Sequence, residues 1–179
     1  MEIIHIFGNI YSAKYKEYPV NEFRRLFKNW TDTAYLENFF EENAKDLNTE
    51  FYKNSPIEDA IFNTIEEAYQ LQQTVLSLAK SGDSKGLEDL FKPLHQEEKN
   101  SVFSNRKVYG LRSKSWLRIY ALKTMDGIYM ITGGAIKLTR SMQEREHTRH
   151  ELIKMNWCEF FLKEQGVYDL EGFHEMNLL

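Results

Sequence analysis

The segment RSKSWLRIYALKTMDGIYMITGGAIKLTR, residues 112–140, decides the fold because it has the pattern of a β-hairpin. Asp126-Gly127 separates two runs rich in β-branched and aromatic residues, and an Asp-Gly pair in that setting is a strong hairpin signal. A two-residue turn at this point pairs Tyr120 with Gly133 across the ladder. We therefore predict two antiparallel strands joined at Asp126-Gly127.

Strand alternation sorts the side chains of this hairpin into two faces, because directly paired residues lie on the same side of a sheet. One face is apolar and is predicted to be core: Leu117, Ile119, Ala121, Met130, Ile136 and Leu138. The other face is basic and aromatic: Trp116, Arg118, Tyr120, Tyr129 and Lys137. A bulge at Gly133-Gly134 would shift this register.

The residues before the hairpin extend it into a meander. VYGLRSKSW predicts another strand that ends in a tight turn at Ser113–Ser115. This turn keeps Arg112 on the basic face, opposite Trp116, and puts Lys114 at the tip. Residues 106–140 are therefore predicted to form a three-stranded antiparallel meander.

The other elements place the meander in an α+β fold. Alternation predicts a strand within residues 1–11, and Ser55, Pro56 and Glu58 form a helix start with a capping box. That helix continues to a stop at Gly82. Further helices are predicted around residues 23–30, 35–40 and 147–166. The order is an N-terminal strand, two or three helices, the meander and a C-terminal helix.

Charge is unevenly distributed along the chain. The net charge is −4, but residues 99–154 hold 12 Lys and Arg against 4 Asp and Glu, which is +8. Residues 1–98 carry −8 and residues 155–179 carry −4. A basic patch in an acidic protein indicates a polyanionic partner. The alternative is that the acidic flanks neutralise the patch within the molecule.

Composition narrows the class of protein. The 179 residues, 42 % of them hydrophobic, suit one folded domain. No apolar run reaches the roughly 18 residues of a membrane span, and the acidic start predicts no signal peptide. The single cysteine, Cys158, cannot form an internal disulfide, so we expect a cytoplasmic protein without membrane contact.

The basic and aromatic face has the side chains that bind single-stranded RNA. Cations hold phosphates, and flat rings stack bases. The predicted RNA-binding residues are Lys114, Trp116, Tyr120 and Arg140, beside Arg112, Arg118 and Lys137. In the alternative, this is an ordinary sheet face whose Trp116 and Tyr120 are covered by the C-terminal segment. His147 and His150 match no metal motif, and we predict neither a metal nor a cofactor.

This stretch also resembles the RelE/HigB/ParE-type toxin superfamily. The resemblance covers about 35 residues and rests on three short motifs: Leu111-Arg112, Arg118-Ile119-Tyr120 and Ile136-Lys137-Leu138-Thr139. The order of strand, helices, three strands and helix fits that family as well. The resemblance implies that residues 1–179 form a single RelE-like domain with an extended helical N-terminal half.

The function that the resemblance implies is that of a cytoplasmic toxin neutralised by a cognate antitoxin, expected to be a small helix-turn-helix protein. Several members cleave mRNA without a metal, typically on the ribosome, with the 2′-hydroxyl as nucleophile. By position, Arg112 and Arg118 would hold the scissile phosphate, and Lys137 would stabilise the transition state or the leaving oxygen. In that case His147 or His150 is a candidate general acid or base.

A second hypothesis keeps the fold without the catalysis. ParE-type relatives act on DNA gyrase, and fold alone does not determine function. The alternative is therefore a non-catalytic RelE-fold protein that binds a partner: an antitoxin, gyrase or another regulator.

Overall fold

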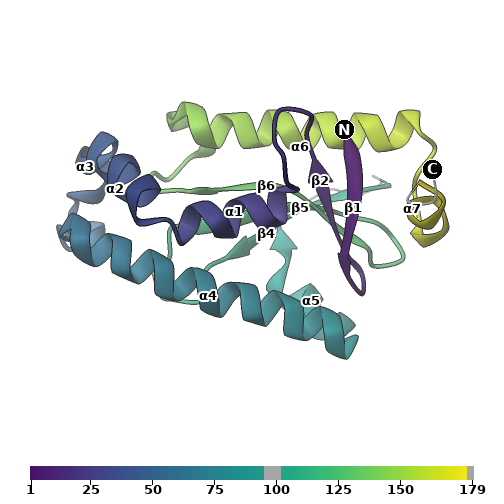
Figure 1. The fold of residues 1–179 in the computed structure, drawn as a ribbon, viewed down its shortest axis with the longest axis horizontal. Coiled ribbons are helices and arrows are strands. Elements are labelled where there is room, and N and C mark those ends of the chain that lie inside the picture. The colour runs from purple at the N-terminus through teal and green to yellow at the C-terminus, as the bar shows by residue number, and fades with distance from the viewer. Residues whose placement is uncertain (95–101, 177–179) are drawn as a thin grey trace.

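A six-stranded sheet lies between two layers of helices in a computed structural model that describes residues 1–94 and 102–176 (Figure 1). The strand order is β1-β2-β6-β5-β4-β3. The strands are β1 (Glu2–Phe7), β2 (Ile10–Lys14), β3 (Lys92–Pro93), β4 (Ser104–Tyr109), β5 (Leu117–Lys123) and β6 (Tyr129–Ile136). The predicted α+β class is confirmed, with a larger sheet than the predicted meander.

The N-terminal segment forms two strands where one was predicted. β1 and β2 make a hairpin that turns at Gly8, whose positive φ of 52° disfavours other residues. A Cβ at Gly8 would also lie 2.5 Å from the carbonyl oxygen of Ala79, so the hairpin approaches α4 closely. β2 then pairs in parallel with β6, which attaches the hairpin to the edge of the meander.

β4, β5 and β6 pair antiparallel in sequence order. The pairing of Tyr120 with Gly133 is as predicted, but Ala121 pairs with Ile131, so Thr132 is an extra residue on β6. The predicted two-residue turn is also wrong. Residues 124–128 form a longer loop, closed by a 3.0 Å hydrogen bond from the Thr124 amide to the Ile128 carbonyl. The bulge compensates for this loop and moves Tyr129 and Met130 to the faces opposite those predicted.

The helices of the N-terminal half cover one face of the sheet: α1 (Glu22–Trp30), α2 (Thr33–Glu42), α3 (Ala44–Leu47), the 3₁₀ turn η1 (Glu50–Tyr52), α4 (Ile57–Ser81) and α5 (Ser84–Leu90). The Asn21 side chain caps α1 by accepting from the Arg24 amide at 2.9 Å. α4 ends at Gly82 as predicted, but the predicted capping box is absent: Pro56 is its N-cap and makes no side-chain bond. Val108, Leu117, Ile119 and Ile136 point into the core on this side.

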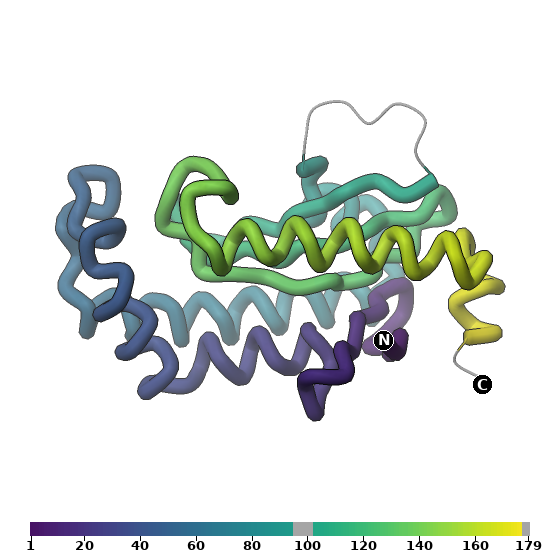
Figure 2. Tube along the Cα trace, turned by 90° about the horizontal axis from the view of Figure 1, so that it is seen from above, coloured from purple at the N-terminus to yellow at the C-terminus, as the bar shows by residue number. Residues whose placement is uncertain are grey.

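The opposite face is covered by α6 (Glu146–Glu164) and α7 (Leu170–Met176), which follow the turn η2 (Met142–Glu144) (Figure 2). Tyr11, Leu122 and Met130 belong to this second core, with Cys158 and Leu162 of α6. No helix in the described parts of the chain has the length and apolar character needed to cross a bilayer.

Candidate functional site

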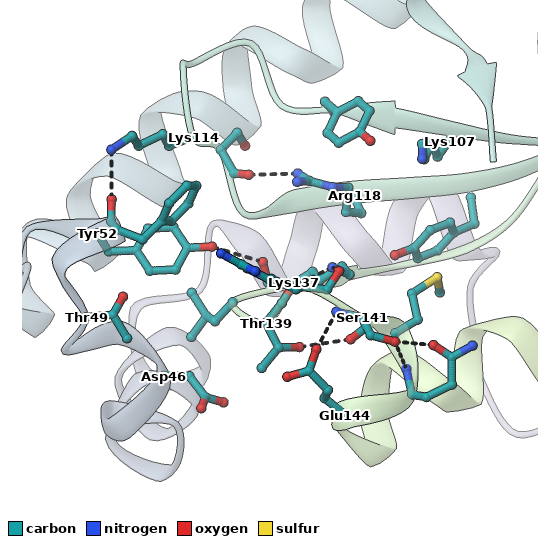
Figure 3. A pocket seen from close by; sticks show the side chains of 18 of the residues that line it. Asp46, Thr49, Tyr52, Lys107, Lys114, Arg118, Lys137, Thr139, Ser141 and Glu144 are labelled. Atoms are coloured by element: carbon teal, nitrogen blue, oxygen red, sulfur yellow. Dashed lines mark hydrogen bonds between the residues drawn. The ribbon is translucent and has the colours of Figure 1, made fainter. Parts of the chain in front are cut away.

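A cleft of about 740 Å³ opens over the end of the sheet that α6 does not cover (Figure 3). β4 and β5 form its floor. η1 and the loop after α3 form one wall, and residues 137–144 form another. Five cations line it: Lys107, Lys114, Arg118, Lys137 and Arg140. We call this feature the cationic cleft.

Strand alternation brings the floor cations to one side of the sheet. Lys107 pairs with Tyr120 across β4 and β5, so both share the cleft face. Arg118 lies two residues before Tyr120 on the same face, while Leu117 and Ile119 point into the opposite core. The prediction put Arg112, Arg118 and Lys137 on one face and Leu117, Ile119 and Ile136 on the other. It is confirmed for Arg118 and Lys137 but is wrong for Arg112.

Within the described residues, none of the five cleft cations forms an ion pair. Four of them donate to backbone carbonyls instead. Arg118 donates to Ser115 at 2.8 Å and to Leu117 at 2.7 Å. The other acceptors are Leu94 for Lys107, Phe51 for Lys114, and Thr139 and Arg140 for Lys137. A carbonyl positions a cation without neutralising it, so among the described residues the five cleft cations outnumber the two carboxylates of the lining, Asp46 and Glu144.

The two carboxylates of the lining are engaged elsewhere. Asp46 forms an ion pair with Arg145, and Glu144 accepts from the Ser141 amide in a capping box. Burial lowers the pKa of Lys137, and the nearby charges of Arg118 and Lys107 lower it further, against an opposing effect of Glu144. Burial also lowers the pKa of Arg118. Crowded cations without a counter-ion form a site that an anion would stabilise.

Two hydroxyls that line the cleft lack partners. The Tyr120 hydroxyl and the Thr49 Oγ1 are buried and make no hydrogen bond within the described residues. Buried polar groups are nearly always satisfied, so each is a donor that a bound ligand can engage. Burial raises the pKa of Tyr120, which keeps its hydroxyl protonated. Phosphate oxygens would satisfy both the hydroxyls and the cations.

Arg112 does not join the predicted site. Its amide donates to the Glu67 carboxylate at 2.8 Å, and its guanidinium binds Glu66 and Asn63. These partners belong to α4, on the far side of the loop between β4 and β5. The turn predicted at Ser113–Ser115 is part of that longer loop, residues 110–116, and Arg112 therefore faces α4 rather than the cleft.

The predicted stacking platforms are also buried. Trp116 is 8 % exposed, lies in the core under α4 and donates from Nε1 to Thr64 at 2.9 Å. Tyr120 is 1 % exposed, although it does line the cleft. Tyr129 lies on the opposite face and donates to Glu88. The prediction of exposed rings is wrong because helices and the cleft walls cover this part of the sheet.

The histidines lie outside the cleft. His147 contacts the Ile136 carbonyl at 2.9 Å and the Phe39 ring, and His150 lies farther along α6. Neither lines the cleft. In residues 1–94 and 102–176, no three His, Cys, Asp or Glu side chains are grouped to hold a metal ion.

The alternative to a polyanion site was that the acidic flanks neutralise the basic segment. Ion pairs of this kind are observed for several cations outside the cleft. The acids of residues 1–98 pair with five cations of this segment: Arg106 and Lys123 with Glu88, Arg112 with Glu66, Arg145 with Asp46, and Lys154 with Glu22. Among the described residues, the five cleft cations and Arg149 are the cations of this segment that form no ion pair.

The sequence analysis did not predict several residues that line the cleft. Lys107 and Tyr109 lie opposite Tyr120 and Arg118, so extending the strand register to β4 would have found them. Thr49, Phe51 and Tyr52 come from η1 and the turn before it. No periodic pattern marks that segment, so only the folded chain shows that it forms a wall.

Comparison of the chain with protein-family models, with curated proteins and with solved structures gives no match. The function is therefore argued from the cleft.

Proposed function

We propose that the cationic cleft binds RNA and that the protein is a RelE/HigB-like toxin, a metal-independent endoribonuclease that cleaves mRNA in the cytoplasm. The observation that carries this proposal is the convergence of Arg118, Lys137 and Lys107 in one cleft, where none of them forms an ion pair with a described carboxylate. Each phosphate of an RNA strand carries the negative charge that this group lacks.

In the proposed reaction, Arg118 and Lys137 each stabilise negative charge that develops in the transition state. Attack of the 2′-hydroxyl on the adjacent phosphorus gives a phosphorane that gains negative charge. Arg118, held by two carbonyls, is a preorganised donor to its oxygens. Lys137, whose pKa is lowered, is a better proton donor to the leaving 5′-oxygen than an ordinary lysine. Glu144, the carboxylate that interacts electrostatically with Lys137, is the candidate base.

The arrangement of the sheet supports the RelE-like assignment. The β4–β5–β6 meander is followed by α6, the order that the resemblance implies. In this proposal, β3 and the segment from α2 to α5 are additions to the RelE-like part, and α2 to η1 turn an open sheet face into a walled cleft. A cognate antitoxin, expected to be a small helix-turn-helix protein, would neutralise the toxin.

The test compares RNA cleavage by the wild-type protein and by Arg118→Gln, with and without ribosomes. We expect cleavage of translated mRNA to fall about 10²–10³-fold, because one transition-state donor is lost. Arg149→Gln is the matched control, since Arg149 is an exposed cation of α6 outside the cleft. Induction of the wild type without antitoxin should arrest growth. Equal cleavage by Arg118→Gln and the wild type would refute the catalytic assignment.

One observation favours the non-catalytic alternative, a RelE-fold protein that binds an antitoxin, gyrase or another regulator. Ile153, Trp157 and Phe160 are exposed on α6 at spacings of four and three residues, so they form an apolar stripe on its outer surface. A wild-type protein that neither arrests growth nor binds RNA, and whose partner binding is lost in Trp157→Ala, would establish this alternative.

A further inference from the structure

We infer that a second hollow beside the cationic cleft is a nucleobase pocket, so that the two together hold one nucleotide of a single-stranded RNA. This inference rests on the proposed function. The hollow has a volume of about 410 Å³ and lies between α4, η1 and the loop that joins β4 to β5. Its walls include Phe51, Tyr52, Trp116 and Asn63.

The two hollows adjoin each other. Phe51, Tyr52, Lys114 and Ser115 line both of them. At the boundary, the Lys114 ammonium lies 4.8 Å from the centre of the Phe51 ring and donates to the Phe51 carbonyl at 3.1 Å. A chain whose phosphate lies in the cleft could therefore place an adjacent group beside Phe51.

The aromatic wall suits a flat ligand. Phe51 is 55 % exposed, although it is a large apolar side chain on a short 3₁₀ turn. Its ring meets Tyr52 edge to face at 4.8 Å, and Tyr52 meets Trp116 in the same way. These contacts hold the Phe51 ring in place while much of its surface stays open. A fixed, exposed aromatic ring beside a phosphate site is the arrangement that stacks a base.

The charged groups of the pocket and those of the cleft differ in their partners. In the pocket, both oxygens of the buried Glu67 accept hydrogen bonds, from the Arg112 amide and the Ser115 hydroxyl. The Arg112 guanidinium is paired with Glu66. Glu67 and Arg112 of the pocket are thus engaged by protein groups, whereas Lys53 and Lys114, at its rim, form no ion pair within the described residues.

Asn63 gives the pocket an edge that can recognise a base. Its side-chain oxygen accepts from Arg112, and its amide N–H groups make no other hydrogen bond within the described residues. A primary amide directed at a base edge distinguishes acceptors from donors there.

The experiment measures the affinity of the full-length protein for short single-stranded RNA by fluorescence anisotropy. The probes are an intact strand and the same strand with abasic sites, both with 2′-O-methyl groups that prevent cleavage. Phe51→Ala should weaken binding of the intact strand by about 5- to 150-fold, the range for loss of one stacked base. It should leave the abasic strand unaffected. Phe62→Ala, which removes an exposed ring of α4 outside both hollows, is the matched control.

The outcomes separate the two proposals. Arg118→Gln should weaken both strands alike, because it removes a phosphate contact. Phe51→Trp should retain the affinity for the intact strand, and melting temperatures should show that each variant is folded. If Phe51→Ala binds the intact strand as the wild type does, or weakens both strands equally, the nucleobase pocket is wrong and the phosphate-binding cleft remains. If the wild type binds neither strand, both proposals are wrong.

Discussion

Two charged regions of the molecule use cations from the same basic segment in opposite ways. In the first, Lys154 of α6 lies 2.6 Å from the buried Glu22 of α1 and 3.0 Å from Glu151. Arg25 completes this ion cluster through a bidentate contact with Glu22 at 2.6 and 2.8 Å. In the second, the cationic cleft, no carboxylate of residues 1–94 and 102–176 pairs with any of the five cations.

The comparison shows that the number of cations in a segment does not predict which of them form ion pairs in the folded protein. The ion cluster joins two helices that are more than 100 residues apart in sequence, and its charges stabilise their packing. It also lies directly against the sheet, because a Cβ at Gly133 would be 1.9 Å from a Glu151 oxygen. Four of the five cleft cations are instead positioned by backbone carbonyls. Variants in the two regions should therefore affect different properties.

The largest effect on stability is expected from Lys154→Met. The change leaves the buried carboxylates of Glu22 and Glu151 without their shared cation, and breaking a buried ion pair in this way typically costs about 3–5 kcal/mol. Urea denaturation measures the loss. The triple variant Lys154→Met, Glu22→Gln, Glu151→Gln is the control and should recover part of it. A loss below about 1 kcal/mol for the single change would mean that the cluster does not stabilise the fold.

A second effect is a pH dependence that arises in the ion cluster. Burial raises the pKa of Glu151 from 4.5 to about 7, although the charge of Lys154 opposes the shift. Between these values the folded protein holds a proton that the unfolded chain releases, so stability should fall as the pH rises from about 4.5 to 7. At about 1.4 kcal/mol per pKa unit, the fall amounts to at most about 3.5 kcal/mol.

Glu151→Gln should flatten that profile, because the titrating group is removed. The charged and titratable groups that face Glu151 are Lys154 of the same helix, Glu22 and Arg25 of α1, and Tyr15 and Cys158. Thermal unfolding at half-unit pH steps compares the two proteins. Identical profiles for the variant and the wild type would assign the titration to another group.

The smallest effect on stability is expected in the cleft. Arg140 is exposed and lines the cleft, so Arg140→Gln should change the free energy of unfolding by no more than about 0.5 kcal/mol. If it contacts phosphate, the slope of log affinity for RNA against log salt should fall by about one. Thermal melts and salt titrations measure the two quantities. A destabilisation as large as that of Lys154→Met would contradict the view that the ion cluster stabilises the fold and the cleft cations do not.

Short-range patterns predicted much of the framework. The alternation in residues 112–140 located β5 and β6 and placed Arg118 on the other face of the sheet from Leu117 and Ile119. The predicted end of α4 at Gly82 is also observed. The failures come from a bulge whose position the neighbouring Gly133-Gly134 pair only suggested, and from a pairing without a local signal. The Thr132 bulge reversed Tyr129 and Met130, and the parallel pairing of β2 with β6 joins segments that are far apart in the chain.

The sequence by itself determined the α+β class, the meander and the side of the sheet on which Arg118 and Lys137 lie, because each follows from a period of two or 3.6 residues within one segment. The tertiary structure decided which cations of the basic segment find a carboxylate. Arg112 meets Glu66 of α4 and Lys154 meets Glu22 of α1. Within the described residues, Arg118 and Lys137 donate to carbonyls and form no ion pair. Ion pairs between distant segments depend on how the helices pack on the sheet. The composition of the chain does not show which cation and which acid this packing brings together.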